Sequence, residues 1–122
     1  MSAQNEFPKV FELLRKILKP YASKLTVNAD ANDIYSLEGS YSEKWKKELF
    51  FGSVQIKKNY VSFYLMPVYM YPDLLTDISP ELRKHMQGKS CFNFRKVEPE
   101  LFKELSKLTR DGFERFNKEN KQ

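Results

Sequence analysis

Residues 49–71, with the sequence LFFGSVQIKKNYVSFYLMPVYMY, constrain the fold of this chain more than any other stretch. Two runs rich in Phe, Val, Ile and Tyr flank Lys58-Asn59, and asparagine readily takes the positive φ that a tight hairpin turn needs. A two-residue turn at this point fixes which residues of the two arms face each other. On one face the pairs are apolar: Ile56 with Val61, Val54 with Phe63, and Gly52 with Leu65. We therefore predict a β-hairpin whose apolar face lies on the core.

The opposite face of the predicted hairpin combines aromatic rings with small polar groups. Its pairs are Lys57 with Tyr60, Gln55 with Ser62, Ser53 with Tyr64, and Phe51 with Met66. Such a surface can both stack and hydrogen-bond, as ligand pockets and partner interfaces do. The alternative is that this face lies under a second layer or simply faces solvent. The candidate ligand-binding residues are Phe51, Ser53, Gln55, Tyr60, Ser62, Tyr64, Met66 and Tyr69.

The rest of the chain predicts a single α+β domain over residues 1–122. The expected elements are an amphipathic helix capped by Asn5 and ending near Lys19, strands at 25–28 and 34–38, a short helix from Ser79 closed by Gly88, a strand at 90–97, and a last helix from Pro99. Gly52 opposite a large Leu indicates a bulge or a close backbone approach. Pro67 and Pro72 are expected to keep residues 66–77 irregular. Trp45 is expected to cover an edge of the core.

These elements predict an antiparallel sheet of about five strands round the central hairpin, flanked by N- and C-terminal helices and one short helix. The core is expected to span about residues 5–116, with a frayed tail at 117–122. The start MSAQNEF lacks the features of a signal peptide, and the longest apolar stretch, 63–71, is too short to span a membrane. With a single cysteine as well, a cytoplasmic protein with no membrane contact is expected.

The net charge of +5 is spread along the chain and does not gather on one stripe. Proteins that bind nucleic acids usually concentrate Lys and Arg on one face, so no strong nucleic-acid binding is expected. Gly88-Lys89-Ser90 is similar to the end of a phosphate-binding loop but lacks the earlier glycine, which leaves Lys89 and Arg95 as weak anion-site candidates.

The candidates for catalysis are the single histidine, His85, and the single cysteine, Cys91. They could meet as base and nucleophile across a helix end. A buried cysteine on a strand is more often small apolar filling, so a non-catalytic protein is expected. The same two residues cannot complete a four-coordinate zinc site, and neither a metal nor a cofactor is expected.

The chain resembles the YdhG-like family of small bacterial domains over roughly residues 10–116. The resemblance lies in the amphipathic first helix and in the segments FGSVQIKKNYVSFYLMPVY, SPELRKHMQGKSCFNF and LFKELSKLTRDGF. It implies an α+β domain with an antiparallel sheet and flanking helices, and some relatives are described as frataxin-like iron chaperones. Here the first helix is basic and no carboxylate lies between Glu48 and Asp73, whereas an iron-delivery surface needs clustered acidic ligands, so iron binding is not carried over.

The leading functional hypothesis is a non-catalytic module that binds a small molecule or a protein. The expected surface is the polar and aromatic hairpin face together with the loop from Pro67 to Pro72. Two alternatives come from other classes: a frataxin-like intracellular iron chaperone, or an enzyme that uses His85 and Cys91.

Overall fold

The computed structural model describes residues 6–42 and 46–119. Within them, six strands form one antiparallel sheet in the order β1-β2-β3-β4-β6-β5. The strands are β1 (Thr26–Asp30), β2 (Ile34–Ser42), β3 (Lys47–Ile56), β4 (Val61–Leu65), β5 (Met86–Gln87) and β6 (Cys91–Phe94). The helices are α1 (Phe7–Leu18), α2 (Met66–Met70), α3 (Pro80–Arg83) and α4 (Pro99–Glu119), with 3₁₀ turns η2 (Lys19–Tyr21) and η3 (Pro72–Leu75).

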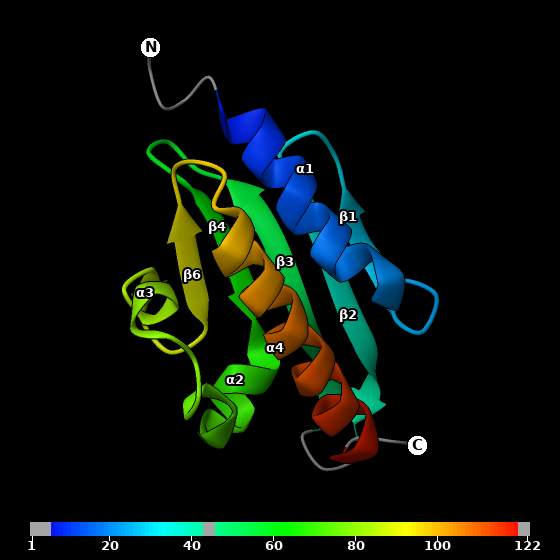
Figure 1. Cartoon of the computed structure of the whole chain (residues 1–122). Helices are drawn as coiled ribbons and strands as arrows, with labels where there is room; N and C mark the ends of the chain where they lie inside the picture. Colours follow the sequence, from blue (N-terminus) through cyan, green and yellow to red (C-terminus); the bar gives the residue numbers. More distant parts are fainter. Residues whose placement is uncertain (1–5, 43–45, 120–122) are drawn as a thin grey trace.

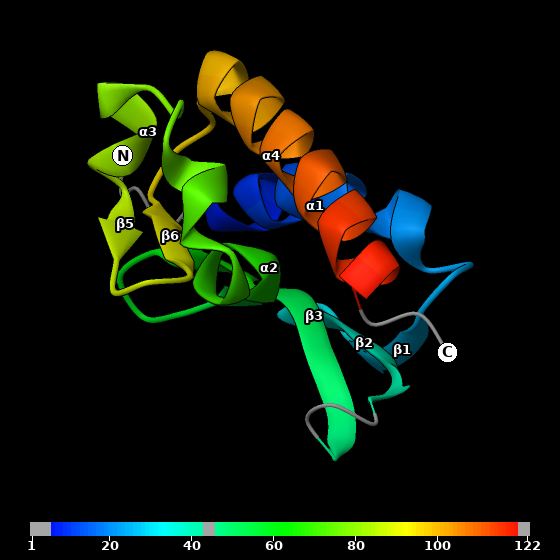
Figure 2. The same ribbon diagram turned by 90° about the horizontal axis from the view of Figure 1, so that it is seen from below.

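Helices α1 and α4 lie side by side over one face of the sheet, as Figures 1 and 2 show. The expected α+β domain with an antiparallel sheet is therefore confirmed. The sheet has one strand more than expected because the helix that starts at Pro80 ends at Arg83. Residues 86–87 then pair with β6 as the short strand β5.

The central hairpin has the predicted register from Gly52 opposite Leu65 to Ile56 opposite Val61. At the turn, the backbone N–H of Lys57 donates to the carbonyl of Tyr60 at 2.8 Å. The positive φ expected at Asn59 is wrong, because Lys46 is the one non-glycine residue with positive φ in the described ranges. The predicted pair of Phe51 with Met66 is wrong. The pairing of β3 with β4 ends at Gly52 and Leu65, and the next residue of the second arm is the first residue of α2.

A β-bulge in β3 explains where Phe51 lies. Along β2, Leu37 and Glu38 are consecutive, but their partners on β3 are Gly52 and Phe50, so Phe51 is the extra residue. A bulge changes the alternation of side chains, and it turns the Phe51 ring toward the helices. The ring centroid lies 5.9, 5.6 and 5.3 Å from those of Tyr21, Phe113 and Phe116. Phe51 is 0% exposed and belongs to the core, which corrects its assignment to the ligand-binding face.

Gly52 follows the bulge, and other parts of the chain approach its backbone closely, as the sequence indicated. A Cβ at this position would lie 3.0 Å from the carbonyl oxygen of Tyr64 and 3.1 Å from Cδ2 of Leu18. Only a residue without a side chain lets α1 lie so near to the sheet. The glycine thus sets the distance between α1 and the central hairpin.

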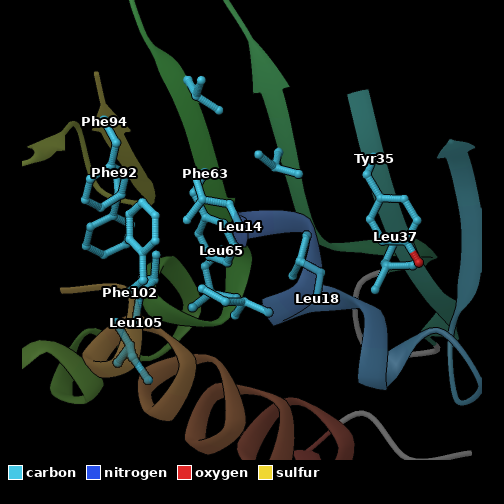
Figure 3. Close-up of a cluster of buried hydrophobic side chains, with 14 of the residues drawn as sticks. Leu14, Leu18, Tyr35, Leu37, Phe63, Leu65, Phe92, Phe94, Phe102 and Leu105 are labelled. Carbon is cyan, nitrogen blue, oxygen red and sulfur yellow. The ribbon is translucent and has the colours of Figure 1, made fainter. Parts of the chain in front are cut away.

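The core lies between the sheet and the two long helices (Figure 3). Strands β4 and β6 place every second side chain on this side, so that Phe63 is opposite Phe92 and Val61 is opposite Phe94. All four are 0% exposed. Helix α4 adds Phe102, whose ring meets that of Phe94 edge-on at 4.9 Å between centroids.

Two predictions about the prolines and Gly88 are wrong. Pro67 and Pro72 do not keep their segment irregular, because each stands in the first turn of a short helix, where a missing N–H costs little. Gly88 does not cap a helix. Gly88 has the expected positive φ, 79°, but it lies in the turn that joins β5 to β6.

The ends of the long helices follow the sequence in part. Helix α1 ends at Leu18, close to Lys19 as expected. The residue before Pro20 is not driven out of the α region, because Lys19 has φ −55° and ψ −37° and the chain continues as η2. Helix α4 continues to Glu119, three residues past the expected end of the core at 116. The predictions for Asn5, Trp45 and residues 120–122 lie outside the described residues.

Helix α3 is held against α4 through its N-terminal cap. The hydroxyl of Ser79 accepts a hydrogen bond from the backbone N–H of Leu82 at 3.1 Å, as predicted for a Ser cap. In turn, the carboxylate of Glu104 on α4 accepts from the hydroxyl of Ser79 at 2.7 Å and from its backbone N–H at 2.6 Å. One carboxylate therefore fixes the cap and its backbone together.

Glu104→Ala is expected to lower the free energy of unfolding by about 1–3 kcal/mol, because it leaves two partly buried donors of Ser79 without an acceptor. Urea denaturation measures the change. The matched control is Glu114→Ala on the exposed side of the same helix, which should stay within about 0.5 kcal/mol of wild type. Equal effects of the two substitutions would show that the bonds to Ser79 add nothing to stability.

Candidate functional site

The sheet face away from α1 and α4 carries a polar cluster, which we call the polar sheet face. It comprises Ser53, Gln55, Ser62, Tyr64, Cys91 and Asn93 from the three adjacent strands β3, β4 and β6. The amide of Gln55 donates to Ser53 Oγ at 3.2 Å, and the hydroxyl of Ser62 donates to Asn93 Oδ1 at 2.7 Å. The amide of Asn93 donates onward to Gln87 Oε1 at 2.6 Å. Two of the predicted hairpin residues, Gln55 and Ser53, thus bond to each other, and a third, Ser62, bonds to β6.

This internal bonding leaves the polar sheet face little capacity for a ligand. Ser53 and Ser62 are 1% exposed, and their hydroxyl groups are bonded to the longer side chains of Gln55 and Asn93. Burial raises the pKa of the Tyr64 hydroxyl, since the phenolate would lose hydration. The predicted site residues Ser53, Gln55, Ser62 and Tyr64 therefore lie together, on a face that satisfies its own polar groups.

The structure does not bring His85 and Cys91 together as base and nucleophile. The imidazole of His85 stacks on Phe94, at 4.6 Å between ring centroids, on the core side of β6. Its Nδ1 donates to the carbonyl of Asn93 at 2.7 Å, and its Nε2 lies 3.2 Å from the carboxylate of Glu98. The thiol of Cys91 lies on the opposite face, 3.3 Å from Asn93 Oδ1. Burial raises the pKa of Cys91, which favours the unreactive thiol.

A cavity of about 630 Å³ opens between the α2–η3 segment and the turn that joins β5 to β6. We call it the α2–β5 cavity. Its apolar walls are Val68, Tyr69, Pro72, Leu75 and Met86. Two cations, Arg83 and Lys89, complete the lining together with Gly88. Tyr69 is 55% exposed, so the face of its ring is available to a ligand.

A second cavity, of about 650 Å³, lies beside β6 where β5 has ended, and we call it the β6-edge cavity. Its polar and charged lining is Tyr60, Lys84, His85, Gln87, Asn93, Arg95, Lys96 and Glu98, and Met86 is shared with the first cavity. The two cavities are thus on either side of the segment from α3 to β5.

The sequence-predicted site residues are divided among several places in the structure. Tyr69 lines the α2–β5 cavity and Tyr60 lines the β6-edge cavity. Met66 is partly buried as the first residue of α2. Lys89 and Arg95 do not form one anion site, because they lie beyond opposite ends of β6 and line different cavities.

The sequence reasoning missed the cavity residues at the end of α3 and just after it, namely Arg83, Lys84 and Met86. The sequence predicts a short helix over residues 83–87, and in this segment it indicates only His85 as a site candidate. The available signal was Gly88, whose positive φ suits a hairpin turn as well as a helix cap.

In residues 6–42 and 46–119, no three side chains of His, Cys, Asp or Glu are grouped so that they could hold a metal ion. No helix in this part of the chain combines the length and the apolar character that crossing a membrane requires.

Comparisons of the chain with known protein families, with curated proteins and with solved structures found no match. The resemblance to the YdhG-like family therefore stays a prediction. What the protein does has to be inferred from the geometry of its own cavities.

Proposed function

We propose that the protein is a non-catalytic binding module whose ligand is a small molecule with an apolar body and one acidic group, held in the α2–β5 cavity. The observation that carries this proposal is the exposed ring of Tyr69 in an apolar cavity with two cations. The proposal keeps the hypothesis of a binding module from the sequence. Of the two predicted parts of its surface, it keeps the segment from Pro67 to Pro72 and leaves out the hairpin face.

The size and the walls of the cavity fit a small organic molecule. Ligand pockets usually measure about 300–1,000 Å³ and are lined mainly by apolar and aromatic side chains with a few polar groups. The α2–β5 cavity, at about 630 Å³, has this composition. Val68 forms its base, since it is 1% exposed, while Tyr69 and Pro72 stand at its open side.

The charges of the α2–β5 cavity favour an acidic group on the ligand. Arg83 donates one hydrogen bond from Nη2 to the carbonyl of Leu75 at 2.7 Å, which holds the guanidinium in place and leaves its other N–H groups for a ligand. Lys89 makes no ion pair with any residue in the described ranges. The described lining includes no carboxylate, so an acid entering the cavity meets only positive charge.

The module is proposed to work in the cytoplasm, and membership of the YdhG-like family would be consistent with its α+β fold. Iron delivery and catalysis by His85 with Cys91 stay as alternative predictions. The absence of a base–nucleophile contact between these two side chains is the reason to prefer binding over that particular catalysis.

A panel of apolar carboxylic acids, each with its neutral amide, tests the proposal. An acid present at 100 times its Kd should raise the free energy of unfolding by about 2.7 kcal/mol, which a thermal-shift assay detects. Calorimetric titration should then show that Lys89→Gln weakens the binding of the acid about tenfold and leaves the amide almost unchanged, because only the acid uses the ammonium group. Tyr69→Ala should weaken both about fivefold to tenfold.

The matched control is Lys103→Gln, which removes one exposed charge from α4 outside this cavity. It should leave the affinity for the acid unchanged. The proposal is wrong if no acid in the panel raises the melting temperature, or if Tyr69→Ala binds the acids as well as wild type does.

A further inference from the structure

The β6-edge cavity gathers positive charge from two separate parts of the chain. Lys84 comes from the turn after α3, whereas Arg95 and Lys96 follow β6 on the way to α4. The cavity lies beside β6 and next to β5, which has only two residues. We propose that this cavity is a second binding site, which takes a small molecule carrying a multiply charged anionic group such as a phosphate or a polycarboxylate.

The three cations of this cavity have no carboxylate partner of their own. None of Lys84, Arg95 and Lys96 forms an ion pair within the described ranges. The carboxylate that lines the cavity, that of Glu98, lies 3.2 Å from Nε2 of His85. Like charges that converge on one cavity repel each other, and a bound anion with two or more negative charges relieves that repulsion.

Glu98 lies beside His85. Nδ1 of His85 donates to the backbone carbonyl of Asn93 at 2.7 Å, and its ring stacks on the buried Phe94. Because Nδ1 carries a proton for this bond, Nε2 donates to the Glu98 carboxylate 3.2 Å away only when the ring is protonated. Glu98 makes no ion pair with Lys84, Arg95 or Lys96 within the described ranges, so these three side chains remain to contact the anion.

The remaining walls favour a small anion over a nucleic-acid strand. Tyr60 offers a hydroxyl group and Met86 an apolar side, in a cavity of about 650 Å³. A polynucleotide needs a stripe of cations along its backbone, whereas these cations converge on one cavity. The site is independent of the one proposed for the apolar acid, although Met86 borders both cavities.

Calorimetric titration with inorganic phosphate, pyrophosphate and citrate at constant ionic strength tests the site. Saturable binding of pyrophosphate or citrate is expected, and which of the two binds tighter assigns the anionic group. The double variant Arg95→Gln with Lys96→Gln should weaken that binding about tenfold or more, because it removes two charged donors. Both side chains are exposed, so the variant should melt close to wild type.

A control with the same loss of charge separates a site from general attraction. Lys9→Gln with Lys16→Gln removes two exposed cations from α1 and should leave binding unchanged. Tyr69→Ala should also leave the binding of pyrophosphate and citrate unchanged, because Tyr69 lines only the α2–β5 cavity. The two proposed sites can therefore be refuted separately. Three results would overturn the proposal: no saturable binding of any probe, equal loss in the two double variants, or tighter binding of a single-stranded RNA than of pyrophosphate and citrate.

Discussion

Phe63→Ala is expected to lower the free energy of unfolding by about 3–5 kcal/mol, which is enough to unfold a domain of ordinary stability. Phe63 is 0% exposed and lies in β4 between Val54 of β3 and Phe92 of β6. Neither neighbouring strand can move into the space, because each is tied to β4 by its own backbone hydrogen bonds. The substitution therefore leaves a cavity in the middle of the core, in addition to the lost burial. Denaturation in guanidinium chloride, followed by circular dichroism, measures the change.

The next residue of the same strand supplies the comparison for Phe63. Tyr64 is partly exposed on the polar sheet face, and Tyr64→Ala is expected to cost only about 1–2 kcal/mol. The two substitutions remove rings of nearly equal size from opposite faces of β4. If Tyr64→Ala destabilises as much as Phe63→Ala, the polar sheet face contributes to stability as the core does, and the unequal roles of the two faces are refuted.

Phe51→Ala should produce a similar loss, again about 3–5 kcal/mol. Its ring contacts those of Tyr21, Phe113 and Phe116, so the substitution removes the point where η2 and the second half of α4 meet the sheet. Edge-on ring contacts add to the burial. Thermal unfolding and denaturant titration should agree on the size of the effect.

Phe50→Ala is the matched control for Phe51→Ala, since it removes the same side chain from the adjacent position. Phe50 is half-buried and paired with Glu38 on the other side of the bulge, so its loss should cost about 1 kcal/mol. A larger effect at Phe50 than at Phe51 would contradict the bulge and restore the simple alternation that the sequence suggests.

The register of the central hairpin could be predicted because it depends on local information. The turn at Lys58-Asn59 and the period of two in each arm are both visible in the sequence, and together they allow one pairing only. The place of Phe51 could not be predicted in the same way. It depends on an extra residue in β3 relative to β2. The pairing of these two strands joins residues that are distant in sequence, since Leu37 and its partner Gly52 are 15 positions apart.

The candidate site was predicted only in part for a similar reason. Tyr60 and Tyr69 were named from composition, and each lines a cavity. The walls that were missed, Arg83, Lys84 and Met86, come from the end of α3 and the residues after it. In this segment a helix of two turns and a short strand share the same apolar spacing at Leu82 and Met86. The partner strand β6 decides between them, because its backbone groups pair with residues 86–87. No local pattern contains that information.

The order of elements along the chain has a consequence for synthesis on the ribosome. Helix α4 follows all six described strands, yet it supplies Phe102, Leu105 and Phe113 to the core. At about 5–20 residues per second, the sheet residues emerge seconds before the helix that covers them. During that time the apolar side chains that pack on α4, such as Phe51 and Phe94, lack this cover, and the exposed apolar surface makes the nascent chain prone to aggregate until α4 is complete.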